Sequence, residues 1–166
     1  LLSKENRSVW IAQREGRTKD GNDATHQGVL KMVAMASDDK NCIDYFKKIK
    51  IVPVSISYEY DPTDALKMPQ LLAQAKDEVY IKEKNEDFIT LLSGIIGQKK
   101  RIHIHVGEVL DNELDDIVLN NDNTNKQIQA VAQIIDDSIL QSYKLWPTNY
   151  IAYDILNNSN MFSNRY

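Results

Sequence analysis

The sequence lacks the features that mark disulfide-linked, membrane-spanning and nucleic-acid-binding proteins. Its 166 residues include one cysteine, Cys42, which excludes an internal disulfide and indicates a reducing compartment. No apolar run approaches the roughly 18 residues that a membrane-spanning helix requires, and no secretory signal pattern opens the chain. There is no basic excess either: the formal net charge of −4 argues against a general nucleic-acid binder, so we expect no nucleic-acid partner.

An initiator methionine is also missing. The chain begins with Leu1 and Leu2, as if in the middle of a helix, and we expect it to be a piece of a longer protein. Its 42% hydrophobic and 27% charged residues are ordinary for a soluble globular domain. We therefore expect a cytoplasmic protein whose contact with a membrane is at most peripheral, on the inner face.

Hydrophobic periodicity predicts strands that are separated by helices. Apolar runs or alternation predict a buried strand over residues 8–12 and further strands within residues 48–62 and 101–110. Helical spacing predicts helices over residues 25–36, 41–48, 86–100, 125–146 and 148–158, and one after a loop within residues 61–84. Residues 111–125 are polar and predict a loop, and the tail from residue 157 predicts a frayed end.

This order of elements favours an α/β fold, with a mixed, mostly parallel sheet flanked by helices and a helical tail. We divide the chain into a main part, residues 1–120, and a helical C-terminal extension, residues 121–166. Pro53 lies inside the clearest strand and cannot donate a ladder hydrogen bond, which predicts a sheet edge or a bulge at that point.

A charged block, residues 14–21, follows the first predicted strand and precedes the first predicted helix. Three cations fall within six positions, between and beside glycines: the block reads Arg14, Glu15, Gly16, Arg17, Thr18, Lys19, Asp20, Gly21. Glycines allow a close approach of the backbone, and guanidinium groups bind phosphate oxygens through paired N–H donors. The spacing is not that of a P-loop. Both a phosphate-binding turn and a solvated turn with incidental ion pairs fit this pattern.

The stretch IAQREGRTKDG, followed some thirty residues later by IVPVSISYEYDP, resembles the glycerolphosphate acyltransferase family of phospholipid biosynthesis. Residues 15–21 are similar to the block E-G-G-R-S-R-T-G of its glycerol-3-phosphate type, with one glycine missing. Residues 51–56 resemble the later proline motif, and residues 101–110 resemble the strand that follows it. The resemblance spans residues 1–110 and identifies residues 1–120 as the C-terminal part of such a domain.

The resemblance implies transfer of a fatty acyl group from acyl-CoA or acyl carrier protein to glycerol phosphate or lysophosphatidate. Arg17 and Lys19 would hold the acceptor phosphate with help from Arg14, and Gly16 would let the backbone approach it. Glu15 would bind the acceptor glycerol or orient the arginines. The strand with Pro53 would shape the acyl side of the cleft. No metal or bound cofactor is implied, because the acyl carrier is a cosubstrate.

The family's catalytic His-x4-Asp motif is absent from this sequence. His26, His103 and His105 are followed five positions later by Lys31, Glu108 and Leu110. The general base is therefore expected upstream, with no catalytic residue in this chain, which would be inactive alone. The alternative hypothesis is a non-catalytic module that binds a phosphate or a phospholipid head group.

Other candidate residues have plain structural interpretations beside functional ones. His103 and His105 alternate with isoleucines, which fits a metal-binding pair or a polar sheet face. His26 suits a capping or supporting role at a helix start, and Cys42 suits a small core position. Residues 88–96 form an apolar helical sector followed by Lys99, Lys100 and Arg101. This sector is either a core helix or a patch that contacts anionic lipid.

Overall fold

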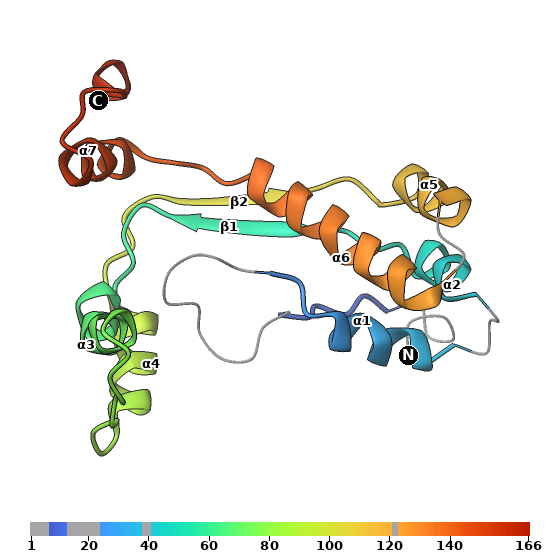
Figure 1. Cartoon of the computed structure of the whole chain (residues 1–166), viewed down its shortest axis with the longest axis horizontal. Helices are drawn as coiled ribbons and strands as arrows, with labels where there is room; N and C mark the ends of the chain where they lie inside the picture. Colours follow the sequence, from blue (N-terminus) through green and yellow to red (C-terminus); the bar gives the residue numbers. More distant parts are fainter. Residues whose placement is uncertain (1–6, 13–23, 38–40, 121–122) are drawn as a thin grey trace. The chain divides into compact units, whose positions relative to one another are not determined.

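The computed structural model describes residues 7–12, 24–37, 41–120 and 123–166 (Figure 1). In chain order the elements are α1 (Gln27–Met35), α2 (Cys42–Ile49), β1 (Val54–Tyr58), α3 (Asp64–Ala75), α4 (Glu86–Ile96), β2 (Ile102–Val106), α5 (Asn112–Asn120), α6 (Thr124–Gln141), α7 (Pro147–Leu156) and the short 3-10 helix η1 (Ser163–Arg165). Most of the expected helices, and the strands near residues 54–58 and 102–106, are confirmed.

The predicted α/β fold with a mostly parallel sheet is wrong. The protein is 55% helix and 7% strand, and β1 and β2 form a two-stranded antiparallel sheet. Two helices, α3 and α4, lie between these strands in the chain. The end of α4 returns to the start of α3, where Gly94 lies against Thr63, so β2 runs back along β1.

The predicted strand at residues 8–12 does not form. Residues 7–12 have no strand pairing, and Val9, Trp10 and Ile11 are 52%, 68% and 46% exposed. High strand propensity becomes a strand only when a neighbouring strand supplies ladder hydrogen bonds. Within the described part of the chain, β1 and β2 pair only with each other.

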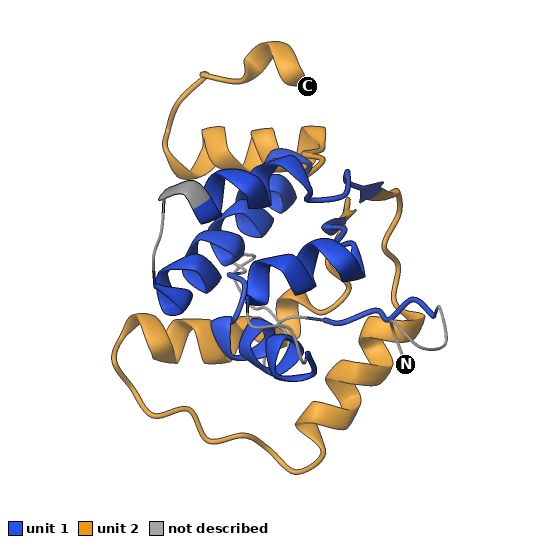
Figure 2. Cartoon of the chain, turned by 90° about the vertical axis from the view of Figure 1, so that its right-hand side faces the viewer, with its two compact units in different colours: residues 1–55, 105–142 blue, residues 56–104, 143–166 orange. Residues whose placement is uncertain are grey.

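The chain divides into two compact units that interleave in sequence (Figure 2). Unit 1 comprises Leu1–Ser55 and His105–Ser142, and unit 2 comprises Ile56–Ile104 and Tyr143–Tyr166. The boundary passes through both strands, so each unit contains a part of each. The division at residues 120 and 121 stays a prediction.

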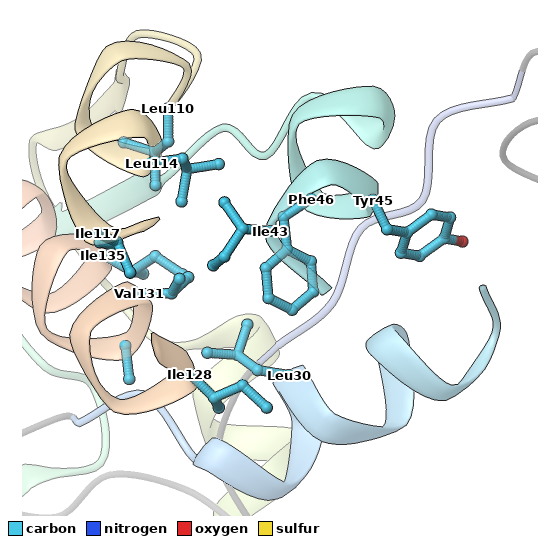
Figure 3. Close-up of a cluster of buried hydrophobic side chains, with 11 residues drawn as sticks. Leu30, Ile43, Tyr45, Phe46, Leu110, Leu114, Ile117, Ile128, Val131 and Ile135 are labelled. Carbon is cyan, nitrogen blue, oxygen red and sulfur yellow. The ribbon is translucent and has the colours of Figure 1, made fainter. Parts of the chain in front are cut away.

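Unit 1 has a hydrophobic core between α1, α2, α5 and α6 (Figure 3). Its members are Leu30, Ile43, Tyr45, Phe46, Leu110, Leu114, Ile117, Ile128, Val131, Ala132 and Ile135. The loop predicted at residues 111–125 is wrong, because residues 112–120 form α5. Leu114 and Ile117 are three positions apart and are 0% and 4% exposed, so burial of one helical face outweighs the polar composition of this segment.

Unit 2 buries little apolar surface. Helix α3 has no buried residue, α4 buries only Thr90, and α7 buries only Asp154. The predicted frayed tail is instead ordered by Asp154, whose carboxylate accepts hydrogen bonds from Ser159 Oγ at 2.6 Å, Phe162 N–H at 2.9 Å and Tyr166 Oη–H at 3.1 Å. Polar contacts therefore hold this unit where a core would otherwise be expected.

Candidate functional site

The charged block lies outside the described residues. The roles predicted for Arg14, Glu15, Gly16, Arg17 and Lys19 therefore stay predictions. The flanking segments are described: residues 7–12 precede the block and residues 24–37, with α1, follow it. Both flanks belong to unit 1.

Pro53 lies at the start of β1 and is buried. Its carbonyl accepts a hydrogen bond from Gly107 N–H at 2.9 Å. A proline immediately before a strand loses no ladder bond, because its missing N–H is not required there. Pro53 thus anchors the beginning of β1 in unit 1.

Unit 1 contains a cavity of about 580 Å³ beside the segment that leads into the charged block. It is lined by residues 7–11, residues 48–52, Val29, Leu30, Val33, Val54 and Ile135. The lining is predominantly apolar, and its volume is in the range of small-molecule sites. Pro53 is not in this lining, although its neighbours Val52 and Val54 are.

Three basic residues contribute to the cavity wall: Arg7, Lys48 and Lys50. Lys50 ends α2 in the left-handed conformation and its ammonium contacts the Asp111 carboxylate at 2.7 Å. None of these three residues was predicted as a site residue. A signal was present in part, because lysine and isoleucine alternate over residues 48–51, shortly before β1. An apolar cavity with basic residues on its wall suits an amphiphile with an anionic group.

The start of α1 is tied to α6 in unit 1. Thr25 is buried, and its backbone N–H donates to Asp136 Oδ1 at 2.7 Å. His26 occupies the N-cap position but makes no side-chain capping hydrogen bond, so the capping role expected of it is not fulfilled. The first turn of α1 has no acidic residue. The hydrogen bond between Thr25 and Asp136 fixes the position at which the chain enters α1.

The three cations expected at a membrane have different environments in unit 2. Arg101 forms a two-point ion pair with Glu59, at 2.9 and 3.0 Å, and its guanidinium lies 4.4 Å from the centre of the Trp146 ring. Hydrogen bonds from Arg101 hold the pKa of Glu59 below its usual value. Arg101 therefore serves the internal structure of unit 2. Lys99 donates to the carbonyls of Ile95 and Gly97 at 3.1 Å, and Lys100 lies 5.2 Å from the Tyr60 ring centre.

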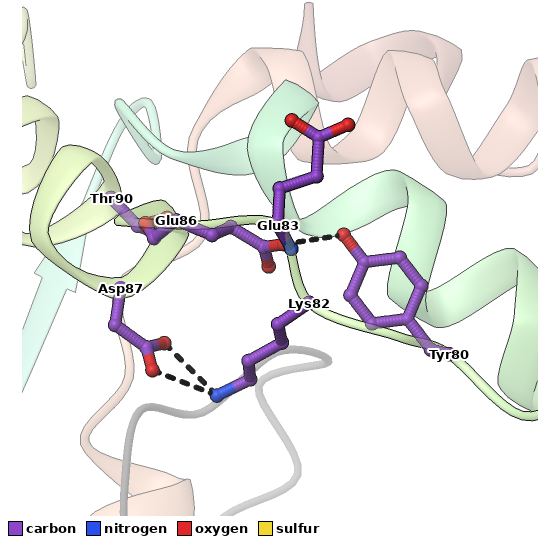
Figure 4. Close-up of polar contacts among 6 residues, drawn as sticks. All are labelled: Tyr80, Lys82, Glu83, Glu86, Asp87 and Thr90. Carbon is purple, nitrogen blue, oxygen red and sulfur yellow. Dashed lines mark hydrogen bonds and ion pairs between the residues drawn. The ribbon is translucent and has the colours of Figure 1, made fainter.

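A polar cluster fixes the start of α4 (Figure 4). The Glu86 carboxylate accepts from Tyr80 Oη–H at 2.8 Å and from Glu83 N–H at 3.0 Å. Lys82 contacts both oxygens of Asp87 at 3.0 Å. The hydrogen bond to Glu86 raises the pKa of Tyr80, which keeps the phenol protonated. These contacts tie residues 80–83 to the first turn of α4, which has no side-chain N-cap hydrogen bond.

The described residues contain no metal site and no helix that could cross a membrane. No group of three or more potential metal ligands occurs there, so His103 and His105 do not gain the further ligands that a metal pair would need. Cys42 is half-buried with its sulfur 3.8 Å from Gln127 Oε1. Burial raises the pKa of this thiol, so it is a poor nucleophile. Within the same residues, every helix is too short or too polar for a membrane span.

Comparison with known proteins yields no relative: no protein-family model, no curated protein and no solved structure matches the chain. The function is therefore inferred from the residue types of the charged block and from the cavity that residues 7–11 line.

Proposed function

We propose that this chain is the acceptor-binding part of an acyltransferase that transfers a fatty acyl group from a thioester to a hydroxyl of a glycerol phosphate. One juxtaposition carries the proposal. Residues 7–11 line an apolar cavity whose wall includes Arg7, Lys48 and Lys50, and the same segment continues within three residues into Arg14 and the charged block. A lipid-phosphate acceptor has an acyl chain and a phosphate. The apolar wall of the cavity suits the acyl chain, and the charged block suits the phosphate.

The residues of the charged block have separate roles in binding the acceptor. Arg17 and Lys19 hold the acceptor phosphate, Arg14 adds a further N–H donor, and Glu15 binds a glycerol hydroxyl or orients the arginines. Anchoring the phosphate brings the free hydroxyl to the thioester, which is catalysis by proximity. In the reaction a C–O bond forms at the thioester carbonyl as the C–S bond breaks and the thiol leaves. The hydroxyl proton goes to a base, and no histidine of this sequence stands in the family's His-x4-Asp motif.

Titration of the chain with glycerol 3-phosphate and with lysophosphatidate tests the binding role. We expect Arg17→Ala to weaken both by about 1.5–3 kcal/mol, or roughly 10- to 150-fold, the usual effect of removing a hydrogen bond to a charged group. Arg165→Ala is the matched control, because it removes the same charge from an exposed position in unit 2. Equal affinities of the wild type and Arg17→Ala would exclude Arg17 from the site.

Trp10 is a built-in reporter for the cavity. It lines the cavity and is 68% exposed, and the other tryptophan, Trp146, belongs to unit 2. In a Trp146→Phe variant, lysophosphatidate should shift the Trp10 emission to the blue as an acyl chain displaces water. Glycerol 3-phosphate, which has no acyl chain, should bind with little shift. A lysophosphatidate titration that leaves Trp10 emission unchanged would separate the cavity from the acceptor site.

Turnover distinguishes the enzyme from the alternative, a non-catalytic module for phosphate or phospholipid head groups. We expect the 166-residue chain to bind the acceptor but to show no acyl transfer from acyl-CoA above background. Restoring activity by adding an upstream segment that contains His-x4-Asp would support the enzyme. Acceptor binding with no activity in that longer chain would support the module.

A further inference from the structure

Helix α4 has its apolar side turned outward. Six large hydrophobic residues occupy an arc of about 160° at the usual 3.6 residues per turn. They are Phe88, Ile89, Leu91, Leu92, Ile95 and Ile96, and their exposed fractions range from 44% to 73%. We refer to these six residues as the α4 apolar face. The interpretation of this segment as a core helix is therefore wrong.

The inner side of α4 is made of small and polar residues. Thr90 is buried and its hydroxyl donates to the Glu86 carbonyl at 2.8 Å. A Cβ on Gly94 would lie 3.6 Å from the Thr63 methyl group, and a Cβ on Gly97 would collide with the Pro62 ring. A helix of a water-soluble domain normally buries its apolar face and exposes its polar one. In α4 this arrangement is inverted, so in the described residues the apolar face is exposed to water and has no core to pack against.

Positive charge follows α4 in the chain, three and four residues after Ile96. The Lys99 ammonium contacts only backbone carbonyls, those of Ile95 and Gly97, and the Lys100 ammonium lies over the Tyr60 ring. In the part of the chain that the structure describes, neither ammonium contacts a carboxylate. Both cations are therefore available to an anionic surface, and the Lys99 ammonium lies at the Ile95 carbonyl in the last turn of α4.

We infer that the α4 apolar face, with Lys99 and Lys100, docks unit 2 on an anionic lipid surface. The face would enter the boundary between head groups and acyl chains, and the two ammonium groups would contact lipid phosphates. A second copy is less well matched. The two carboxylates in the first turn of α4 are already engaged, Asp87 by Lys82 and Glu86 by Tyr80, so an antiparallel α4 pair would offer Lys99 and Lys100 no unengaged acid from α4 itself.

Sedimentation of the chain with vesicles tests this inference. We expect binding to phosphatidylglycerol–phosphatidylcholine vesicles, weaker binding to pure phosphatidylcholine, and weaker binding in added salt. Lys99→Gln with Lys100→Gln should weaken binding to the anionic vesicles roughly 25-fold, about fivefold for each cation. Ile95→Gln with Ile96→Gln should weaken it more than about tenfold on both kinds of vesicle.

Matched variants control for charge and for surface hydrophobicity. Lys31→Gln with Lys126→Gln removes the same net charge from exposed positions in unit 1. Ile155→Gln with Leu156→Gln removes two side chains of α7 that are 73% and 83% exposed, similar to Ile95 and Ile96. Both controls should bind vesicles as the wild type does. Circular dichroism checks that each variant keeps its helix content.

Two outcomes would overturn the inference. Equal binding by the Lys99/Lys100 variant and the Lys31/Lys126 variant would show that only net charge matters. A dimer in analytical ultracentrifugation that Ile95→Gln with Ile96→Gln converts to a monomer, in a protein that does not bind vesicles, would assign the face to a second copy. Neither outcome depends on acyl transfer, so the inference stands or falls separately from the proposed function.

Discussion

In unit 1, eleven buried hydrophobic side chains pack against one another between four helices. In the described residues of unit 2, the buried side chains are Trp146 and three polar ones, Thr63, Thr90 and Asp154. The large apolar residues of α3, α4 and α7 are mostly exposed instead. The same chain thus contains one unit that buries its hydrophobic side chains and one that presents them.

The two units are therefore stabilised in different ways. Unit 1 is stabilised by removing apolar surface from water, which is non-directional and large in sum. Unit 2 depends on directional contacts: the Arg101–Glu59 pair, the Tyr80–Glu86 cluster and the Asp154 carboxylate. Each such polar contact contributes little compared with the sum of a buried core, so unit 2 is expected to open more readily than unit 1.

The largest expected effect is that of Phe46→Ala in unit 1. Phe46 is 0% exposed, and truncation of a buried phenylalanine costs about 3–5 kcal/mol through lost transfer energy and a residual cavity. Hydrogen exchange should show lost protection in α1, α2, α5 and α6. A variant that keeps wild-type protection in these helices would show that the unit 1 core is not what stabilises them.

Gly97→Ala should be the most damaging small change in unit 2. A Cβ at residue 97 would collide with Pro62, and such overpacking costs about 1–3 kcal/mol. Gly94→Ala is the matched control: its nearest neighbour would be the Thr63 methyl at an ordinary 3.6 Å, and alanine should favour the helix by about 1 kcal/mol. Urea unfolding should therefore move in opposite directions for the two variants. Stabilisation by both would place Pro62 away from the end of α4.

Protonation of the Asp154 carboxylate at low pH should release the C-terminal segment of unit 2. Burial alone would raise the pKa of this carboxyl, but hydrogen bonds from Ser159, Phe162 and Tyr166 outweigh it and hold the pKa below the ordinary 3.8. Its stabilising contribution is therefore complete above that value and is lost as the pH falls through the lower folded pKa.

The amide resonance of Phe162 reports this release, because that N–H donates to Asp154. It should shift as the pH falls below about 4. In Asp154→Asn the shift should be absent and the segment 159–166 should already be mobile at neutral pH. A resonance in Asp154→Asn that still titrates like the wild type would assign the pH dependence to another group.

The smallest expected effect is that of Phe88→Ala on α4. Phe88 is 63% exposed, so its removal should change the free energy of unfolding by less than about 0.5 kcal/mol in the absence of lipid. The same substitution type at Phe46 is expected to cost several times more, which makes the pair a direct measure of the contrast between the units. A large loss for Phe88→Ala would show that the α4 apolar face is covered in solution.

Much of the local structure could be predicted from residues close together in sequence. Asn41 accepts from Ile43 N–H at the start of α2, as N-cap chemistry favours, and α2 begins one residue from the predicted start at residue 41. Of the candidate site, the charged block was recognisable from its residue types alone. The cavity in unit 1 was not recognisable, because residues 7–11, residues 48–52 and Ile135 are brought together only by folding.

The sequence by itself determined the periodicities of α1, α2, α4 and α6 and the alternation of β1 and β2, because helix and strand preferences act over a few neighbouring residues. It also determined the order of the charged block and the proline motif. Only the tertiary structure decided how those elements are used. The segment 8–12 has strand propensity but no pairing partner, α5 forms because Leu114 and Ile117 find a core, and α4 exposes the face that its pattern would bury. Strand pairing and burial depend on contacts between residues distant in the chain, and local composition does not specify those contacts.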